Sequence, residues 1–178
     1  MKKDECIQYA IGESSLGFVL VAKSDQGLCV VQFGDSRDEV KRSLRERFPD
    51  AIFSSGSAEI QQLLIQVTNM IENPSNTLNC ALDIRGTEFQ LRVWKALREI
   101  PTGSTLSYID IAMQIGAPKS PRAVATACAA NPLVVVIPCH RVVRLDSVPS
   151  GYRYGLERKN QLLQREKELQ KSNMAMMS

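Results

Sequence analysis

Prolines divide this chain into short segments, and that limits what it can fold into. Pro49, Pro74, Pro101 and Pro132 each follow an apolar, periodic segment of the kind that forms a helix. Proline cannot continue a helix, because it lacks the backbone N–H and clashes with the preceding turn. The 178 residues therefore predict several short helices and strands, in one ordinary domain or two small ones.

Two β-rich runs near the start of the chain predict a hairpin. Phe18–Ala22 and Leu28–Phe33 are separated by a short polar segment of the kind that forms a turn. Asp35 or Ser36 can then cap a helix whose apolar residues recur every four positions and which ends before Pro49. These elements predict the core of a small α/β domain.

A second helix and a polar turn complete this half of the chain. The helix is expected over residues 58–72, where one face is apolar, and it ends before Pro74. Residues 73–79 are turn formers, and 80–84 could return as one more strand. The boundary of the first domain is therefore expected near residue 85.

The second half predicts three helices followed by a strand. Thr87 caps the first helix, which ends at Ile100. Residues 108–114 and 121–130 then form two short helices of the size found in a helix-turn-helix. The second has almost only small side chains, so it can lie close to a protein core or to a DNA groove. The β-branched run 133–137 is expected to form a strand.

A last amphipathic helix is expected over about 156–171. We expect its apolar side chains to face inward and its basic side chains to face outward. The inward residues are Leu156, Leu162 and Leu163, and the outward residues are Arg158, Lys159, Arg165 and Lys167.

Charge is distributed unevenly along the chain. Residues 1–84 carry eight Lys and Arg against twelve Asp and Glu, a net charge of −4, whereas residues 85–178 carry fourteen against seven, a net charge of +7. A basic half is typical of a protein that binds a polyanion such as nucleic acid. A solvated basic face with no partner is the commoner cause of such a bias.

The five cysteines do not predict a disulfide framework. Their number is odd, and the polar start of the chain does not resemble a secretory signal, so we expect a cytoplasmic protein with free thiols. There is no Cys-x-x-Cys pair and only one histidine, so we expect no metal. Apolar runs such as Leu133–Ile137 are far too short to span a bilayer, so no membrane partner is expected.

One cysteine stands out by its position. Cys139 follows the predicted strand 133–137 and a stiffening proline, lies beside the only histidine, His140, and has Arg141 and Arg144 close by. Positive charge and an imidazole favour the thiolate, which is the nucleophilic form of cysteine. A lone cysteine is more often a buried small hydrophobic residue, so the neighbours carry this hypothesis.

A catalytic imidazole must itself be oriented by an acceptor. Glu157 and Glu166 of the last helix could both accept a hydrogen bond from the ring of His140, so Cys139, His140 and a glutamate could form a relay. The alternative for His140 is a structural histidine with satisfied hydrogen bonds.

These residues belong to a longer ordered pattern. Pro138–Val142 reads Pro-Cys-His-Arg-Val and matches the active-site motif of the O6-alkylguanine-DNA alkyltransferases, also called methylated-DNA–protein-cysteine methyltransferases. The closest likeness is to the C-terminal half of a larger bacterial member whose amino-terminal half repairs phosphotriesters, so this chain could be part of a larger protein. The other matching residues are Phe89, Val93-Trp94, Leu97, Ile100-Pro101, Gly103, Thr105, Ser107-Tyr108, Ile111-Ala112, Arg122-Ala-Val124, Asn131-Pro132, Gly155-Leu156, Lys159, Leu162-Leu163 and Glu166.

The resemblance implies an α+β fold in two domains. Residues 1–85 would form a small α/β amino-terminal domain of ribonuclease H-like topology. Residues 86–178 would form a mainly helical carboxy-terminal domain that contains a helix-turn-helix, binds DNA and accepts the methyl group.

The resemblance also implies roles for five residues. Cys139 would be the methyl acceptor, and His140 and Glu166 would activate it through water. Asn131 would be the hinge that braces the active-site turn, and Tyr108 would donate a proton to the departing guanine. A thiolate opposite a phenol suits the displacement of guanine from a methyl carbon.

Further roles follow from the same resemblance for the DNA-binding helix and the substrate pocket. Arg122 would fill the space that a flipped nucleotide leaves, and the backbone at Cys139 and Val142 would hold the base edge. After Tyr152 the family commonly has a small polar residue and then glycine, but here a bulkier pair follows, which bears on the range of adducts. The expected DNA-binding residues are Arg122, Ala123, Ala127 and Tyr108, and the pocket residues are Val142, Tyr152, Arg153 and Tyr154.

The implied activity is repair of O6-methylguanine, and of O4-methylthymine, in double-stranded DNA containing alkylated bases. The methyl group would pass to Cys139 as a thioether that nothing in the chain could hydrolyse, so each molecule would act once, as a monomer and without a cofactor. Two other classes remain open from the residues alone. One is a helix-turn-helix regulator in which Cys139 is incidental or a redox sensor, and the other is a cysteine hydrolase that uses Cys139 and His140.

Overall fold

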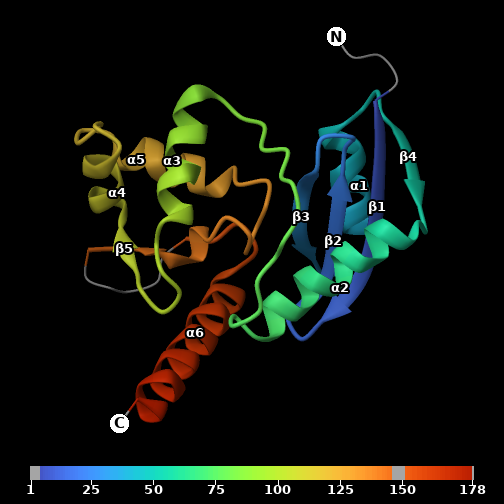
Figure 1. The fold of residues 1–178 in the computed structure, drawn as a ribbon. Helices are drawn as coiled ribbons and strands as arrows, with labels where there is room; N and C mark the ends of the chain where they lie inside the picture. Colours follow the sequence, from blue (N-terminus) through green and yellow to red (C-terminus); the bar gives the residue numbers. More distant parts are fainter. Residues whose placement is uncertain (1–4, 146–150, 178) are drawn as a thin grey trace. The chain divides into compact units, whose positions relative to one another are not determined.

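The computed structural model describes residues 5–145 and 151–177 and has a mixed α+β fold (Figure 1). The chain forms two compact units. The first is Met1–Arg85 with Pro132–Val134, and the second is Gly86–Asn131 with Val135–Ser178.

A four-stranded sheet in the order β3-β2-β1-β4 forms the centre of the first unit. The predicted hairpin is confirmed as β2 and β3, which pair antiparallel, while β1 pairs antiparallel with β2 and parallel with β4. Neither β1 nor β4 was predicted from the sequence. The bounds are β1 Cys6–Ser14, β2 Gly17–Lys23, β3 Leu28–Gly34 and β4 Ile52–Ser55.

Both predicted helices of this unit are present, as α1 (Arg37–Arg47) and α2 (Ala58–Glu72). Each begins after a serine whose hydroxyl accepts a backbone N–H: Ser36 from Glu39, and Ser57 from Ile60. The helices cover opposite faces of the sheet (Figure 1). This agrees with the burial of Val19–Ala22 on both faces of β2.

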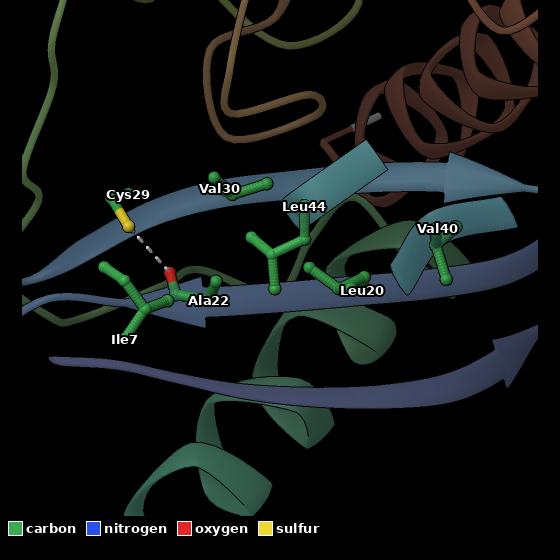
Figure 2. Packing of buried hydrophobic residues seen from close by; sticks show 7 residues of the cluster. All are labelled: Ile7, Leu20, Ala22, Cys29, Val30, Val40 and Leu44. Carbon is green, nitrogen blue, oxygen red and sulfur yellow. Dashed lines mark hydrogen bonds between the residues drawn. The ribbon is translucent and has the colours of Figure 1, made fainter. Parts of the chain in front are cut away.

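Figure 2 shows the cluster in which α1 packs on the sheet. The side chains of Val40 and Leu44 lie beside Leu20 of β2, and all three are almost completely buried. Cys29 belongs to the same cluster, and its thiol donates to the carbonyl of Ala22 at 3.5 Å. Burial raises the pKa of Cys29 to about 12, so this cysteine is a structural thiol.

The prediction of a strand over 80–84 is wrong. Only one bridge forms, between Leu28 and Leu82, through two backbone hydrogen bonds of Leu28, to Ala81 at 2.9 Å and from Asp83 at 2.8 Å. The hydroxyl of Ser24 also donates to the carboxylate of Asp83 at 2.6 Å. Gly27 allows the approach: it has a φ of 146°, and a Cβ there would lie 2.5 Å from the carbonyl oxygen of Ala81.

The prediction of a strand over 133–137 is also wrong. Pro132 accepts a hydrogen bond from the N–H of Val31 at 2.9 Å, and the N–H of Val134 returns one to Val31 at 3.1 Å. The chain then turns at Val135, which has a φ of 72°. A left-handed residue cannot continue a strand, so the apolar run forms isolated bridges on either side of a turn.

The second unit contains the helices predicted for it. A parallel pair of short strands, β5 and β6, and a single 3-10 turn, η1, complete it. The bounds are α3 Glu88–Arg98, β5 Leu106–Ser107, α4 Tyr108–Gln114, α5 Pro121–Ala129, η1 Cys139–Arg141, β6 Val142–Val143 and α6 Leu156–Met176.

Capping and a buried tryptophan hold the helices of this unit in place. Thr87 and Ser107 form capping boxes at the starts of α3 and α4. The indole N–H of Trp94 in α3 donates to the carbonyl of Ala127 in α5 at 2.9 Å, which fixes α5 against α3. Among residues 5–145 and 151–177, no helix has the length and hydrophobicity that a membrane span requires.

Candidate active site

Cys139 lies in a turn and not, as predicted, at the end of a strand. It is the first residue of η1, and its N–H donates to the carbonyl of Ile137 at 2.8 Å. Its side chain is buried, and the sulfur accepts a hydrogen bond from the Nδ2 of Asn131 at 3.2 Å. The thiol is therefore held in one place by backbone and side-chain contacts.

Asn131 braces the turn from the end of α5. Its N–H donates to the carbonyl of Cys128 at 3.2 Å, and its Nδ2 donates both to the carbonyl of Ile137 at 2.7 Å and to the sulfur of Cys139. An amide nitrogen carries two hydrogens, so both are used. Asn131 is buried, and its role as a hinge stays a prediction.

His140 and Glu166 face each other. The Nε2 of His140 lies 3.4 Å from an Oε of Glu166, and both side chains are buried. The sequence left the acceptor open between Glu166 and Glu157, and the structure places Glu157 on the exposed side of α6. The Nδ1 of His140 is buried and has no hydrogen-bond partner among the described residues.

Arg141 binds Glu166 rather than the thiol. Its Nε lies 2.6 Å from one carboxylate oxygen of Glu166 and its Nη2 lies 2.5 Å from the same oxygen. Its Nη1 donates to the carbonyl of Ile100 at 2.6 Å, and its Nη2 also donates to the hydroxyl of Thr102 at 3.0 Å. The prediction that Arg141 and Arg144 supply the positive charge beside the thiol is therefore not supported.

Lys159 supplies that charge. Its position among the other basic residues of the last helix predicted that Lys159 faces outward, but its side chain is only 1% exposed. Its ammonium donates to the carbonyl of Val142 at 2.7 Å and to that of Gly151 at 3.1 Å. Among the charged side chains, it is Lys159 that lowers the pKa of the Cys139 thiol.

Helical spacing could have revealed this residue. Three other buried residues follow Lys159 by three, four and seven positions, so all of them share one face of α6: Leu162, Leu163 and Glu166. All four are buried. Leu156, which was predicted to face inward, is 46% exposed instead.

The electrostatics favour an uncharged pair at rest. Burial raises the pKa of Cys139 despite the opposing effects of Asn131 and Lys159. Burial also lowers the pKa of His140, although Glu166 opposes that shift. Both shifts disfavour a charge, so the resting site holds a thiol beside a neutral imidazole.

The predicted pocket residues differ in their placement. Tyr152 has a buried hydroxyl without a hydrogen-bond partner in the described structure, and burial together with nearby Cys139 raises its pKa. The ring of Tyr154 meets that of Tyr152 edge-on at 6.0 Å and is partly exposed. Arg153 is exposed, with its guanidinium 5.6 Å from the Tyr154 ring, so it lies outside the buried cluster.

The backbone groups expected to hold a base edge already have partners. The N–H of Val142 donates to the carbonyl of Cys139, and the carbonyl of Val142 accepts from Lys159. The N–H of Val142 is therefore already used within the protein.

The predicted DNA-binding residues lie on α4 and α5. Tyr108 is the first residue of α4 and is half-buried, and Arg122 and Ala123 are exposed at the start of α5. Ala127 is 2% exposed, on the side of α5 that packs against Trp94. The buried side chain of Ala127 does not favour a direct contact with DNA, and its DNA-binding role stays a prediction.

The hydrogen-bonded and charged cluster thus brings together Asn131, Cys139, His140, Glu166 and Lys159. Tyr108 and Arg122 lie apart from it in the sequence, on the two short helices. Among the described residues, no group of three or more His, Cys, Asp or Glu side chains is arranged to hold a metal ion.

Known proteins resemble this chain over much of its length. The family described as 6-O-methylguanine DNA methyltransferase, DNA binding domain, matches residues 88–168. The bifunctional transcriptional activator/DNA repair enzyme Ada of Escherichia coli (strain K12) is 47% identical over 162 residues, which cover 91% of this chain and 46% of Ada. The chain spans about half the length of Ada and of the regulatory protein ada of Salmonella typhimurium, of which 45% is covered.

Other relatives match over nearly their whole length. The methylated-DNA–protein-cysteine methyltransferase of Methanosarcina acetivorans is 38% identical over 160 residues, which cover 89% of this chain and 97% of that protein. The crystal structure of Mycobacterium tuberculosis OGT in complex with DNA has a TM-score of 0.75 at 34% identity and covers 90% of this chain and 93% of that one. On these matches, the chain belongs to the methylated-DNA–protein-cysteine methyltransferase family.

Proposed function

We propose that this chain repairs double-stranded DNA by moving the methyl group of O6-methylguanine, and of O4-methylthymine, onto Cys139. The observation that carries this proposal is the arrangement of Asn131, Cys139, His140 and Glu166. It holds a buried thiol at a fixed position and places a neutral imidazole next to it in the sequence, oriented by a carboxylate. The named activity of relatives that match over most of their length supports it.

The first step is removal of the thiol proton. Because burial keeps Cys139 protonated, the thiol needs a base when substrate is bound. With the Nε2 of His140 directed at Glu166, Nδ1 is the ring nitrogen that carries the lone pair and accepts the proton through a bridging water. The hydrogen bond from Asn131 and the positive charge of Lys159 then stabilise the thiolate.

The second step is displacement at the methyl carbon. The sulfur of Cys139 forms a bond to this carbon as the bond from carbon to O6 breaks, and the electron pair of that bond stays on guanine. The hydroxyl of Tyr108 donates a proton to the base, and the proton that His140 took from the thiol then returns through solvent to the Tyr108 phenolate, so that both residues regain their starting states. Overall, an S–H becomes S–CH3 and the O–CH3 of the base is replaced by an N–H.

The product explains why one molecule would act once. A thioether has no easily displaced group, so the methyl group would stay on the sulfur of Cys139. The chain would therefore be consumed in proportion to the lesions it repairs.

The exposed start of α5 is the part of the unit that we propose to enter DNA. Arg122 and Ala123 lie there, and a helix with a small side chain at its surface can approach the groove closely. A methyl group on O6 is inaccessible in a stacked duplex, so the nucleotide must rotate out, and Arg122 would take its space. The relative of known structure in complex with DNA supports this partner.

The domain assignment is part of the same proposal. Residues 86–178 would bind DNA through α4 and α5 as a helix-turn-helix and carry the acceptor cysteine. Residues 1–85 would form an α/β domain of ribonuclease H-like topology. The sheet order β3-β2-β1-β4, with β4 parallel to β1, supports that topology.

Intact-mass spectrometry tests the proposal. The chain is incubated with a duplex that contains O6-methylguanine, and the wild type is expected to gain the mass of one methyl group. Cys139→Ser is the matched variant, and it should gain none while still binding the duplex. A DNA-binding regulator would bind without any gain in mass, and a cysteine hydrolase would instead turn over acyl substrates, so either result would overturn the proposal.

A further inference from the structure

We propose that Arg141 is a positioning residue that holds Glu166 and thereby keeps His140 in its neutral, proton-accepting form. The consequence for methyl transfer rests on the function proposed above. The electrostatic effect of Arg141 on His140 does not depend on it and can be measured without DNA.

The geometry gives Arg141 the stronger hold on the carboxylate. One carboxylate oxygen of Glu166 lies 2.6 Å from the Nε of Arg141 and 2.5 Å from the Nη2 of Arg141. The other oxygen lies 3.2 Å from the same Nε and 3.4 Å from the Nε2 of His140. The longest of these contacts is the one to His140, so the guanidinium of Arg141 holds the carboxylate more closely than the imidazole does.

Arg141 is itself fixed from a second direction. Its Nη1 donates to the carbonyl of Ile100 at 2.6 Å, and its Nη2 donates to the hydroxyl of Thr102 at 3.0 Å. Both partners lie in the segment that follows α3. All three nitrogens of the guanidinium therefore have acceptors. Only the planar group of arginine, with its several donors, can make these contacts together.

Three charged side chains act on His140, one negative and two positive. From α6 it faces the negative Glu166 and the positive Lys159, and from its own turn it has the positive Arg141 and the Cys139 thiol. The side chains that α3 buries are apolar: Val93, Trp94, Ala96 and Leu97. Burial is the main cause that lowers the pKa of His140. Glu166 opposes that shift, and the positive charges of Arg141 and Lys159 act against Glu166, so both disfavour an imidazolium.

This neutral state is what the reaction needs. An imidazole that already carries a proton on both nitrogens cannot accept one from Cys139. Without Arg141, Glu166 would pair with His140 alone and stabilise the imidazolium. The site would then need a higher pH before His140 could act as a base.

The single histidine of the chain allows a direct test. The protein is labelled with carbon-13 at the histidine ring, and the ring signals are followed by NMR across the pH range in which the protein stays folded. In Arg141→Gln the titration midpoint of His140 is expected to move to higher pH than in the wild type. Arg141→Lys keeps the charge but cannot bind both oxygens, so a smaller shift in the same direction is expected.

Lys167→Gln is the matched control. Lys167 lies next to Glu166 in α6, is exposed, and its removal changes the net charge by the same amount. The midpoint of His140 should stay where it is in the wild type. An equal upward shift in Lys167→Gln and Arg141→Gln would overturn the proposal, because the effect would then be one of net charge.

The kinetic measurement uses the same proteins. Single-turnover methyl transfer from duplex DNA is measured against pH, and the acidic limb of the profile should move in Arg141→Gln by the same interval as the NMR midpoint. A shifted midpoint with an unshifted rate profile would overturn the role in the reaction. Absence of transfer in the wild type would count against the proposed function, while the NMR comparison would still decide the electrostatic effect.

Near-UV circular dichroism shows whether each variant is folded. If Arg141→Gln does not fold, Arg141→Lys decides the question. A His140 midpoint in Arg141→Lys that equals that of the wild type overturns the proposal.

Discussion

The side-chain amide of Asn131 donates to the sulfur of Cys139 at 3.2 Å. The same nitrogen donates to the carbonyl of Ile137 at 2.7 Å, so one side chain holds both the turn that precedes Cys139 and the reactive atom. The contact to sulfur becomes stronger when the thiol loses its proton, because hydrogen bonds to charged acceptors are the stronger ones. Asn131 therefore holds the turn, and we expect it to contribute to the reactivity of the thiol as well.

Replacing Asn131 with Ala should lower both stability and reactivity. The buried carbonyl of Ile137 loses its donor, and we expect a loss of about 1–3 kcal/mol in the free energy of unfolding, measured by urea denaturation. The methyl-transfer rate should fall about tenfold or more, because the thiolate loses a hydrogen bond worth about 1.5–3 kcal/mol. Asn160→Ala, at an exposed position of α6, is the control and should change neither quantity. An unchanged rate in a folded Asn131→Ala protein would contradict the role given to this side chain.

Lys159→Met should shift the pH dependence of the reaction. Loss of the ammonium removes a positive charge that lowers the pKa of Cys139, so the pKa of the thiol should rise further and methyl transfer should need a higher pH. The carbonyls of Val142 and Gly151 also lose a donor, which should destabilise the fold by about 1–3 kcal/mol. The measurements are single-turnover rates against pH and urea denaturation, with the exposed Lys167→Met as control. A rate profile that coincides with that of the wild type would exclude Lys159 as the charge that acts on the thiol.

Local signals in the sequence were sufficient for most of the helices. Ser36 and Thr87 occupy the cap positions expected of them, and prolines end several helices where the pattern indicated. β4 escaped prediction because it has only four residues, most of them exposed. Its pairing with β1 is parallel and long-range, and no local pattern encodes such a contact.

The candidate site was predictable in its residues but not in its charges. Cys139, His140 and Glu166 could be named from the motif and the helix, yet the partner of Arg141 depends on how α6 packs on η1. The run 133–137 is β-branched, but Val135 adopts a left-handed conformation because tertiary contacts override its propensity for strand. Lys159 was misplaced for a related reason. Its charge predicted an exposed position, although its helical spacing from Leu162 and Leu163 places it on the buried face of α6.

Arg122→Ala should slow the repair of duplex DNA more than that of a substrate whose lesion is already unstacked. Only the duplex requires a side chain to occupy the space of a flipped nucleotide. Single-turnover rates on the two substrates measure this difference. Lys119→Ala removes a nearby exposed charge and is the control, with equal effects expected on both substrates. Equal slowing of both substrates by Arg122→Ala would assign Arg122 to general attraction for phosphate.

His140 should make the stability of the protein depend on pH in a defined window. Burial lowers the pKa of His140 below its ordinary value of 6.5, so the folded protein favours the neutral ring. Its contribution to stability is fully present above the pKa of the unfolded chain and is lost as pH falls from 6.5 through the lower pKa of the folded state. Urea denaturation from about pH 5 to about pH 8 should show this loss in the wild type.

The matched variant is His140→Gln, because the chain has no other histidine. Its stability should vary less over the same pH interval. If both proteins lose stability equally between pH 6.5 and the acidic end of the range, groups other than His140 cause the loss.

Peptide-resolved mass spectrometry with a large excess of methylated duplex tests the central claim most directly. The wild-type chain is left to react to completion with DNA whose O6-methyl group carries an isotopic label, and each cysteine-containing peptide is then analysed. We predict one labelled methyl group per chain, on the sulfur of Cys139, with Cys128 unmodified in the same unit and no further consumption of substrate. A label on any other residue, or more than one lesion repaired per chain, would contradict the assignment of Cys139 as a single-use acceptor.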